Sequence, residues 1–103
     1  MDNYQIKYTQ ASYNDIMQIS IYITYTLLEP EISKQFIKSL LESIRSLDIF
    51  PFRYPIIHYL KLDYILHCKP FKNFYIFYSI DETLKEVDIL RILYNKRDLT
   101  KLL

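Results

Sequence analysis

The sequence predicts an α+β fold in which an N-terminal strand and a helical hairpin pack on one face of an antiparallel sheet. Residues 74–82 and 87–98 are rich in β-branched and aromatic side chains and flank a polar connection, which is typical of a β-hairpin with a longer loop. Two earlier segments repeat apolar residues every three or four positions, as amphipathic helices do. Because a short alternating segment precedes them, the expected order of elements is β-α-α-β-β-β.

Size and composition indicate one globular domain spanning residues 1–103. Hydrophobic residues make up 50% of the chain and charged residues 24%, which excludes an intrinsically disordered protein. No apolar run approaches the roughly 18 residues of a membrane-spanning helix, and the N-terminus lacks a secretory signal pattern. We therefore expect a protein of the cytoplasm with no membrane partner.

Cysteine and histidine usage excludes further classes of protein. Cys68 is the only cysteine, so the chain cannot form an internal disulfide. His58, His67 and Cys68 lack the paired spacing of metal ligands, so we expect neither a metal site nor another cofactor. Cys68 itself is expected to be a small buried hydrophobic residue.

Residues 3–8 predict the first strand, since Tyr4, Ile6 and Tyr8 alternate with polar neighbours. Thr9 can cap the helix that follows by accepting a hydrogen bond from a backbone N–H two or three residues later. The apolar stripe expected on that helix consists of Tyr13, Ile16, Ile19 or Ser20, Ile23 and Leu27.

The second helix is predicted to begin at Pro30, which suits a first helical turn, and Glu31 complements the helix dipole. Its expected buried stripe consists of Ile32, Phe36 or Ile37, Leu40 or Leu41, Ile44 and Leu47. The short connection between the two helices makes them an antiparallel hairpin, which ends before Pro51 and Pro55.

The rest of the chain is predicted to be a loop followed by three strands. Residues 52–59 are expected to form an irregular loop, and residues 60–71 a strand that Pro70 confines to an edge or a bulge. The run 74–82 is apolar on both faces and fits a central strand. Strict alternation in the last strand would place Leu90, Ile92 and Tyr94 on one face and Ile89, Arg91 and Leu93 on the other.

The sequence contains no glycine, the residue that normally supplies the left-handed backbone of tight turns. Asparagine tolerates this conformation better than most other residues. We therefore expect positive φ angles at Asn73 and Asn95.

Positive charge gathers in the C-terminal half, although the net charge of the whole chain is only +1. Residues 53–79 carry four basic side chains against one acidic side chain, and residues 89–103 have the same balance. The last strand leads directly into Lys96 and Arg97. Either these cations form a scattered, solvated surface, or they form a patch that binds a polyanion.

Four segments occur in an order that resembles a known family. They are Thr9-Gln10-Ala11 with a helix bearing Ile19 and Tyr22-Ile23; Pro30-Glu31 with the helix ending Ile44, Leu47, Phe50 and Pro51; residues 73–82; and residues 87–98 with Leu102-Leu103. Together they resemble the RelE/ParE family of bacterial type II toxin–antitoxin toxins. The match covers nearly the whole chain, and Asn95 stands where the family usually has glycine.

The resemblance implies a small toxin that inhibits growth and is neutralised by a cognate antitoxin. RelE-like members are ribosome-dependent mRNA endonucleases, whereas ParE-like members poison DNA gyrase without cutting RNA. In the nuclease, a 2′-hydroxyl attacks the neighbouring phosphate. Cations stabilise the charge on the phosphate oxygens, and an acid and a base move protons.

The resemblance also implies candidate site residues. Arg97 falls at the family's arginine after the last strand and is the leading candidate for a catalytic residue. The other catalytic candidates are Arg91, His67 and Tyr94, and the candidates for binding nucleic acid or another target are Lys69, Lys72 and Lys96. Each type also has a structural interpretation, because arginines pair with carboxylates, aromatic rings pack in sheets, and lysines are usually solvated.

Departures from the nuclease branch favour a ParE-like function. Tyr75 stands where that branch often has an arginine, and no tyrosine follows Leu99. Of its basic residues on the preceding strand, only His67 and Lys69 remain. We therefore expect a toxin that poisons gyrase; the alternatives are a RelE-like mRNA endonuclease and an inactive relative that only binds its antitoxin and helps to repress their operon. The isolated chain is expected to expose an apolar patch or to form a homodimer through it.

Overall fold

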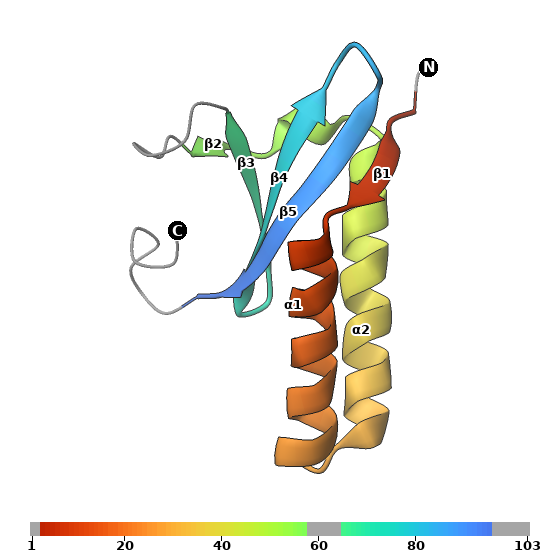
Figure 1. Ribbon diagram of the computed structural model, residues 1–103, viewed down its shortest axis with the longest axis vertical. Coiled ribbons are helices and arrows are strands. Elements are labelled where there is room, and N and C mark those ends of the chain that lie inside the picture. Colours follow the sequence, from red (N-terminus) through yellow and green to blue (C-terminus); the bar gives the residue numbers. More distant parts are fainter. Residues whose placement is uncertain (1–2, 58–64, 96–103) are drawn as a thin grey trace.

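The structure, a computed structural model, describes residues 3–57 and 65–95. These residues form two layers, a twisted sheet and a helical hairpin that covers one of its faces (Figure 1). The elements are β1 (Gln5–Tyr8), α1 (Gln10–Ile21), a π-helical turn (Tyr22–Thr26), α2 (Pro30–Arg45), two 3₁₀ turns (Ser46–Asp48 and Pro51–Arg53), β2 (Ile56–Ile57), β3 (Leu66–Phe71), β4 (Phe74–Asp81) and β5 (Glu86–Tyr94). The predicted α+β fold is therefore confirmed.

The sheet of the described residues has five strands in the order β1-β5-β4-β3-β2, so β4 is central as predicted. The sheet is mixed and not purely antiparallel, because β1 pairs with β5 in the parallel direction. An alternating segment carries no information on the direction of its neighbour, so the sequence could not reveal this pairing. β2 is an additional short strand within the segment 52–59, which was predicted to be an irregular loop. Residues 60–64 of the predicted strand 60–71 lie outside the described part of the chain.

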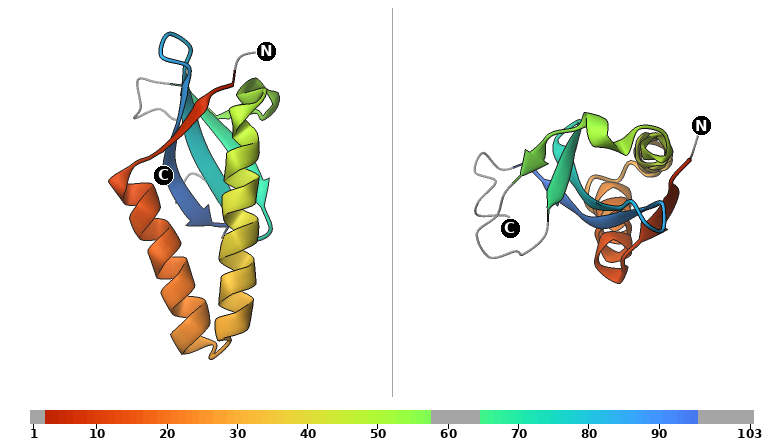
Figure 2. Two further views of the ribbon diagram at one scale, coloured as in Figure 1. Left: turned by 90° about the vertical axis from the view of Figure 1, so that its right-hand side faces the viewer. Right: turned by 90° about the horizontal axis from the view of Figure 1, so that it is seen from above.

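The main core lies between the hairpin and the helix-facing side of the sheet. Its buried members are Ile19, Ile23, Leu40, Ile44, Leu47, Ile76, Tyr78, Val87, Ile89 and Ile92. Figure 2 shows that both helices lie against the same side of the sheet and that the hairpin continues well beyond one end of the strands. The tip of the hairpin therefore has no sheet to pack against.

The capping residue of α1 is confirmed, because Thr9 Oγ1 accepts a hydrogen bond from the backbone N–H of Ser12 at 3.1 Å. Ile19 and Ile23 are buried as predicted, and Ile16 is partly buried. Tyr13 and Leu27, however, are 54% and 50% exposed, so their predicted burial is wrong. Ser12 takes the inward position in the first turn, and Leu27 follows the π-helical turn, which ends the regular spacing of the stripe.

The α2 stripe is confirmed for Leu40, Ile44 and Leu47, which are fully buried. Ile32 is instead 51% exposed, because Ser33 occupies the contact with α1. Ser33 Oγ donates a hydrogen bond to the carbonyl oxygen of Ser20 at 3.2 Å. A small polar residue at this crossing lets the two helix backbones approach closely, a role that a search for apolar residues does not detect.

A β-bulge changes the faces of the last strand. The register between β4 and β5 shifts after Phe77, which is opposite Arg91, whereas Tyr78 is opposite Ile89. One extra residue, Leu90, is therefore inserted into β5. Ile89 and Ile92 both enter the helix-facing core, so the strict alternation expected for this strand is wrong.

Positive φ angles occur at Leu28, Phe50, Lys72 and Lys85 and not at the predicted Asn73 and Asn95. Lys72 and Asn73 connect β3 to β4, and the first of these two residues carries the positive angle, as in a type II′ turn. Each non-glycine residue in this conformation costs on the order of 1 kcal/mol. The position in the turn, and not the preference of asparagine for positive φ, therefore decides which of the two residues adopts this conformation.

Candidate functional site

The predicted site residues that the structure describes do not gather into one exposed cluster. They are His67 and Lys69 on β3, Lys72 in the β3–β4 turn, and Arg91 and Tyr94 on β5. Lys96 and Arg97 lie outside the described residues.

Lys69 is buried against the C-terminal end of α2. Its ammonium donates hydrogen bonds to the carbonyl oxygen of Ser43 at 2.7 Å and to Ser46 Oγ at 2.9 Å. It also lies 5.2 Å from the centre of the Tyr54 ring. Burial and the neighbouring Arg53 lower the pKa of Lys69. In this position the cation satisfies helix carbonyls and complements the negative end of the helix dipole.

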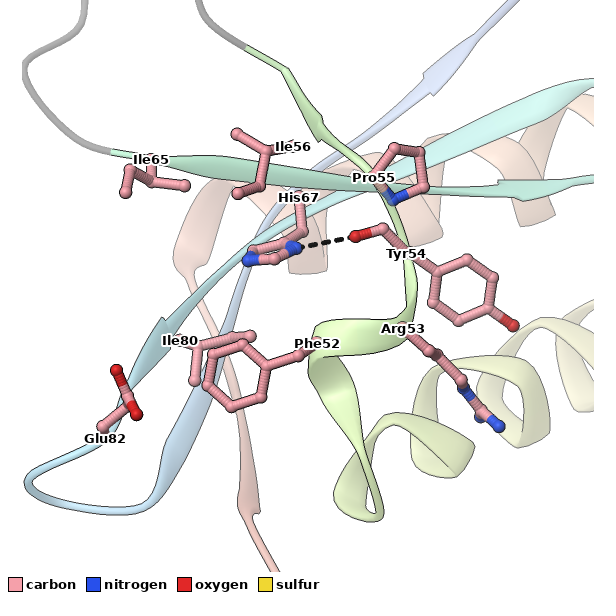
Figure 3. Close-up of a pocket in the computed structure, with 9 residues that line it drawn as sticks. All are labelled: Phe52, Arg53, Tyr54, Pro55, Ile56, Ile65, His67, Ile80 and Glu82. Carbon is pink, nitrogen blue, oxygen red and sulfur yellow. Dashed lines mark hydrogen bonds between the residues drawn. The ribbon is translucent and has the colours of Figure 1, made fainter.

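His67 is also buried, with 5% of its surface exposed. Its Nδ1 atom is 2.9 Å from the carbonyl oxygen of Tyr54, and its ring stacks on Tyr78 at 5.2 Å between centroids. The ring forms one side of a cavity of about 540 Å³ beside the 3₁₀ turn Pro51–Arg53 (Figure 3). We call this cavity the His67 pocket.

Arg91 forms an ion pair that connects the bulged strand to α1. Its Nε and Nη2 atoms donate to the two carboxylate oxygens of Asp15 at 2.8 and 3.0 Å. Asp15 Oδ2 also accepts a hydrogen bond from the backbone N–H of Ile92 at 2.9 Å. The hydrogen bond to Asp15 is the main cause that raises the pKa of Arg91. The side chain of Arg91 is thus held at the N-terminal half of α1.

Tyr94 lines an apolar groove between the hairpin and the end of the sheet. The groove has a volume of about 750 Å³ and is lined by Gln18, Ile19, Tyr22, Ile23, Leu27, Asn73, Phe74 and Tyr94. The ring of Tyr94 packs edge-to-face on Phe74 at 5.5 Å. We call this cavity the Tyr94 groove. The backbone N–H of Asn95 bonds to the carbonyl oxygen of Asn73 at 2.7 Å, which fixes the β3–β4 turn beside the end of β5.

Lys72 lies in this same turn, close to the helix-facing aromatic residues. Its ammonium is 5.2 Å from the centre of the Phe36 ring and 5.6 Å from that of Phe71. Its side chain is exposed. Of the three predicted binding lysines, Lys72 is therefore the one that the described residues place at the surface near the Tyr94 groove.

An exposed apolar surface continues from the groove along the outer side of α1 and the hairpin tip. It consists of Tyr13, Met17, Ile21, Tyr22, Tyr25, Leu27 and Leu28, each at least 43% exposed. We call it the hairpin surface. Residues 16–28 contain no charged side chain, so most of this surface carries no charge of its own. Large contiguous apolar patches of this kind usually mark an interaction site.

Comparison with known proteins identifies the family. The family model described as "ParE toxin of type II toxin-antitoxin system, parDE" matches residues 6–99. This chain belongs to the ParE toxin family. It is therefore a ParE-type toxin of a type II toxin–antitoxin system.

Solved structures share the fold of this ParE-family chain. The chromosomal ParDE toxin–antitoxin system from P. aeruginosa aligns with a TM-score of 0.71 and 17% identity, over 90% of this chain and 97% of the other. The RelBE2 toxin–antitoxin complex from Mycobacterium tuberculosis aligns with a TM-score of 0.66 and 19% identity, over 95% and 97% of the two chains. No curated protein matches the sequence significantly.

Two features of this ParE-family site escaped the sequence analysis. Asp15 was not recognised as the partner of Arg91, because residues so far apart in sequence cannot be paired without the fold. The Tyr94 groove was also missed, although the uncharged run 16–28 is a sequence pattern that could have indicated an unusually apolar helix.

In the described part of the chain, no helix is long and apolar enough to cross a membrane. Those same residues contain no group of His, Cys, Asp and Glu that could hold a metal ion.

Proposed function

We propose that this ParE-type toxin inhibits growth by binding and poisoning DNA gyrase in the cytoplasm, and that a cognate antitoxin neutralises it. The observation that supports a protein target most strongly is the apolar character of the Tyr94 groove and the hairpin surface. Apolar and aromatic residues of this kind bind proteins, whereas a nucleic acid backbone requires exposed cations.

The described cations give less support to RNA cleavage. Lys69 donates its hydrogen bonds to the end of α2, and Arg91 is paired with Asp15. A phosphate would have to displace these contacts before either cation could stabilise charge on its oxygens. His67 Nδ1 is bonded to the carbonyl oxygen of Tyr54, and the isoleucine and phenylalanine side chains beside the ring do not suit a charged phosphodiester. A RelE-like activity would therefore depend on Arg97 and Lys96, together with Lys72, which is exposed.

The antitoxin is proposed to occupy the Tyr94 groove and the hairpin surface. The two similar structures are toxin–antitoxin complexes, which supports a partner of this kind for the present chain. An amphipathic helix or an extended segment with apolar side chains would fit such a surface. Folding of the segment on binding would bury on the order of 1,000–3,000 Å².

The target is tested with purified toxin in two reactions. In a gyrase reaction we expect cleaved DNA that accumulates only when gyrase is present. In a translation reaction we expect ribosome-bound mRNA to remain intact. Cleavage of mRNA that is lost in Arg97→Ala would instead establish the RelE-like alternative. Expression without antitoxin tests the third possibility, since normal growth would identify an inactive relative that only binds its antitoxin.

The antitoxin surface is tested with a matched pair of variants. Leu27→Glu places a charge in the Tyr94 groove, and Leu84→Glu places one in the β4–β5 loop, where Leu84 is 64% exposed. We expect Leu27→Glu to weaken antitoxin binding by at least about tenfold and Leu84→Glu to leave it unchanged. Equal affinity of both variants for the antitoxin would refute this part of the proposal.

A further inference from the structure

The His67 pocket is separate from the Tyr94 groove and has no part in the function proposed above. Its walls are apolar: Figure 3 shows Ile56 and Ile65 on one side and Phe52 and Ile80 on the other. His67 closes one end, between these two walls. A volume of about 540 Å³ is in the range of cavities that bind small molecules or single side chains.

The orientation of the His67 ring is fixed by its neighbours. The ring stacks almost parallel to Tyr78, with 17° between the two planes, and meets the edge of Phe52 at 6.1 Å. Nδ1 points to the carbonyl oxygen of Tyr54, and the other ring nitrogen points away from Tyr54 and into the pocket (Figure 3). Nothing else among the described residues bonds to this second nitrogen.

The hydrogen bond to Tyr54 determines what Nε2 can do. A carbonyl oxygen only accepts hydrogen bonds, so Nδ1 must carry the proton in this contact. In the neutral ring, Nε2 therefore has a free lone pair and acts as an acceptor. The pocket thus presents one hydrogen-bond acceptor between apolar walls.

The charges near the pocket do not favour an ion. The guanidinium of Arg53 is directed away from the cavity and donates to the backbone oxygen of Ser46 at 3.2 Å. Glu82 lies at the outer edge, beyond Ile80. A cationic ligand that reached His67 would lose its hydration without a carboxylate beside it, and this loss is costly. A neutral ligand that donates one hydrogen bond fits these surroundings better.

We propose that the His67 pocket binds a neutral aromatic ring that carries one hydrogen-bond donor, presented as a tyrosine or tryptophan side chain by a protein partner. The ring packs between the walls formed by Phe52, Ile56 and Ile80, and its O–H or N–H donates to His67 Nε2. Tyrosine and tryptophan are the side chains that most often anchor protein interfaces in such pockets. The inference is independent of gyrase as the target, because it uses a different part of the surface.

The test titrates the full-length chain with four probes and follows the His67 ring and the Ile80 methyl groups by NMR. The probes are N-acetyl-tyrosinamide, N-acetyl-tryptophanamide, N-acetyl-phenylalaninamide and N-acetyl-argininamide. We expect the tyrosine or the tryptophan probe to bind about five- to tenfold more tightly than the phenylalanine probe, which lacks the donor. The affinities of the tyrosine and tryptophan probes also show whether the pocket prefers the O–H of tyrosine or the N–H of tryptophan as the donor.

Two variants show whether binding occurs in this pocket. Ile56→Asp places a charge on its wall, and Ile32→Asp is the control on the outer side of α2, where the residue is similarly exposed. We expect Ile56→Asp to abolish probe binding and Ile32→Asp to preserve it. His67→Phe keeps the stacked ring but removes the acceptor. In this variant the tyrosine and phenylalanine probes should therefore bind with equal affinity. If His67→Phe does not fold, the Ile56→Asp comparison still decides the question.

Three results would overturn the proposal. The first is equal binding of the tyrosine, tryptophan and phenylalanine probes to the unmodified chain, which would mean that His67 accepts no hydrogen bond. The second is preferential binding of the arginine probe, which would indicate a cation site at Glu82. The third is the absence of saturable shifts at His67 and Ile80 with any probe.

Discussion

A lysine that was expected to face a target instead supports the fold. Lys69 is 8% exposed, and its ammonium completes the hydrogen bonding of the last turn of α2. We predict that Lys69→Met lowers the free energy of unfolding by about 1–3 kcal/mol, because the carbonyl of Ser43 and the hydroxyl of Ser46 lose their charged donor. Urea unfolding followed by circular dichroism measures this change.

Lys72→Met is the control for the lysine prediction. Lys72 is exposed and its ammonium lies over the rings of Phe36 and Phe71, so its replacement should change the free energy of unfolding by no more than about 0.5 kcal/mol. Equal stability of both variants and the parent chain would show that Lys69 does not cap α2.

Cys68 is predicted to be an unreactive thiol in the native protein. It is 3% exposed, and burial raises the pKa of the Cys68 thiol from 9.0 to about 11. The shift alone lowers the thiolate fraction at pH 8 by about 100-fold. Iodoacetamide at pH 8 should therefore modify the native chain at least about 100-fold more slowly than the urea-unfolded chain, as measured by mass spectrometry.

The same pKa shift has a consequence for stability at alkaline pH. The folded state keeps the Cys68 proton up to about pH 11, whereas the unfolded chain loses it near pH 9.0. The stability that the protonated thiol gives the folded state is therefore complete below pH 9.0 and is lost as the pH rises from 9.0 to about 11. A Cys68→Ala variant lacks this titration and should lose less stability over that interval. Rapid alkylation of the native chain at pH 8 would contradict both expectations.

At the scale of the elements, side chains at the start of α1 form hydrogen bonds with the backbone beside the bulge in β5. The bulge interrupts the β4–β5 ladder, and α1 satisfies the backbone groups next to it. Thr9 Oγ1 lies 2.8 Å from the carbonyl oxygen of Ile89, to which it donates, and Asp15 accepts from the N–H of Ile92 at 2.9 Å. These contacts hold the start of the helix at one place on the sheet.

We predict that Asp15→Ala is more destabilising than Arg91→Ala, although the two residues form one ion pair. Asp15→Ala leaves the N–H of Ile92 without its acceptor and should cost about 2 kcal/mol. Arg91→Ala removes only a partly exposed ion pair and should cost no more than about 1 kcal/mol. Thermal unfolding compares the variants, with Glu31→Ala as a control for an exposed ion pair. A larger loss for Arg91→Ala would show that the ion pair outweighs the backbone contact.

The sequence predicts the elements well because their patterns depend on local spacing. The stripe of Leu40, Ile44 and Leu47, the Thr9 cap and the central strand β4 all follow from periodicity or capping chemistry. The bulge and the parallel pairing of β1 could not be predicted. They depend on how α1 meets β5, which is a contact between residues about 75 to 80 positions apart.

The candidate site was less predictable than the elements for a related reason. A lysine or histidine on a strand has the same local sequence whether it faces solvent or another element. Lys69 is buried by the C-terminal end of α2, and His67 by the segment 51–55. Periodicity along β3 reveals neither contact. Lys72 and Tyr94, at the end of the sheet, are exposed where that covering is absent.

At the scale of the whole molecule, the hairpin and the sheet divide the surface into unlike regions. The hairpin continues beyond the strands, so the outer side of α1 and the tip have no partner within the described chain (Figure 2). Tyr13, Met17 and Ile21 are spaced at four-residue intervals on that outer side. A helix with such a row would normally bury it against another surface. An antitoxin supplies that surface in the proposed complex, and the isolated toxin lacks it.

We therefore predict that the isolated chain self-associates in a concentration-dependent manner through the hairpin surface. Sedimentation velocity should show a rising average mass between about 5 and 200 µM, a range in which moderately sized apolar contacts associate. The double variant Met17→Lys/Ile21→Lys should remain monomeric, because it places two cations on the contact of each copy. The control Ile49→Lys/Leu84→Lys adds the same charge at residues that are 46% and 64% exposed elsewhere, and it should associate like the parent chain. If the control abolishes association equally, net charge and not the hairpin surface governs it. A parent chain that stays monomeric at every concentration would contradict the prediction and show that the hairpin surface does not bind a second copy of itself.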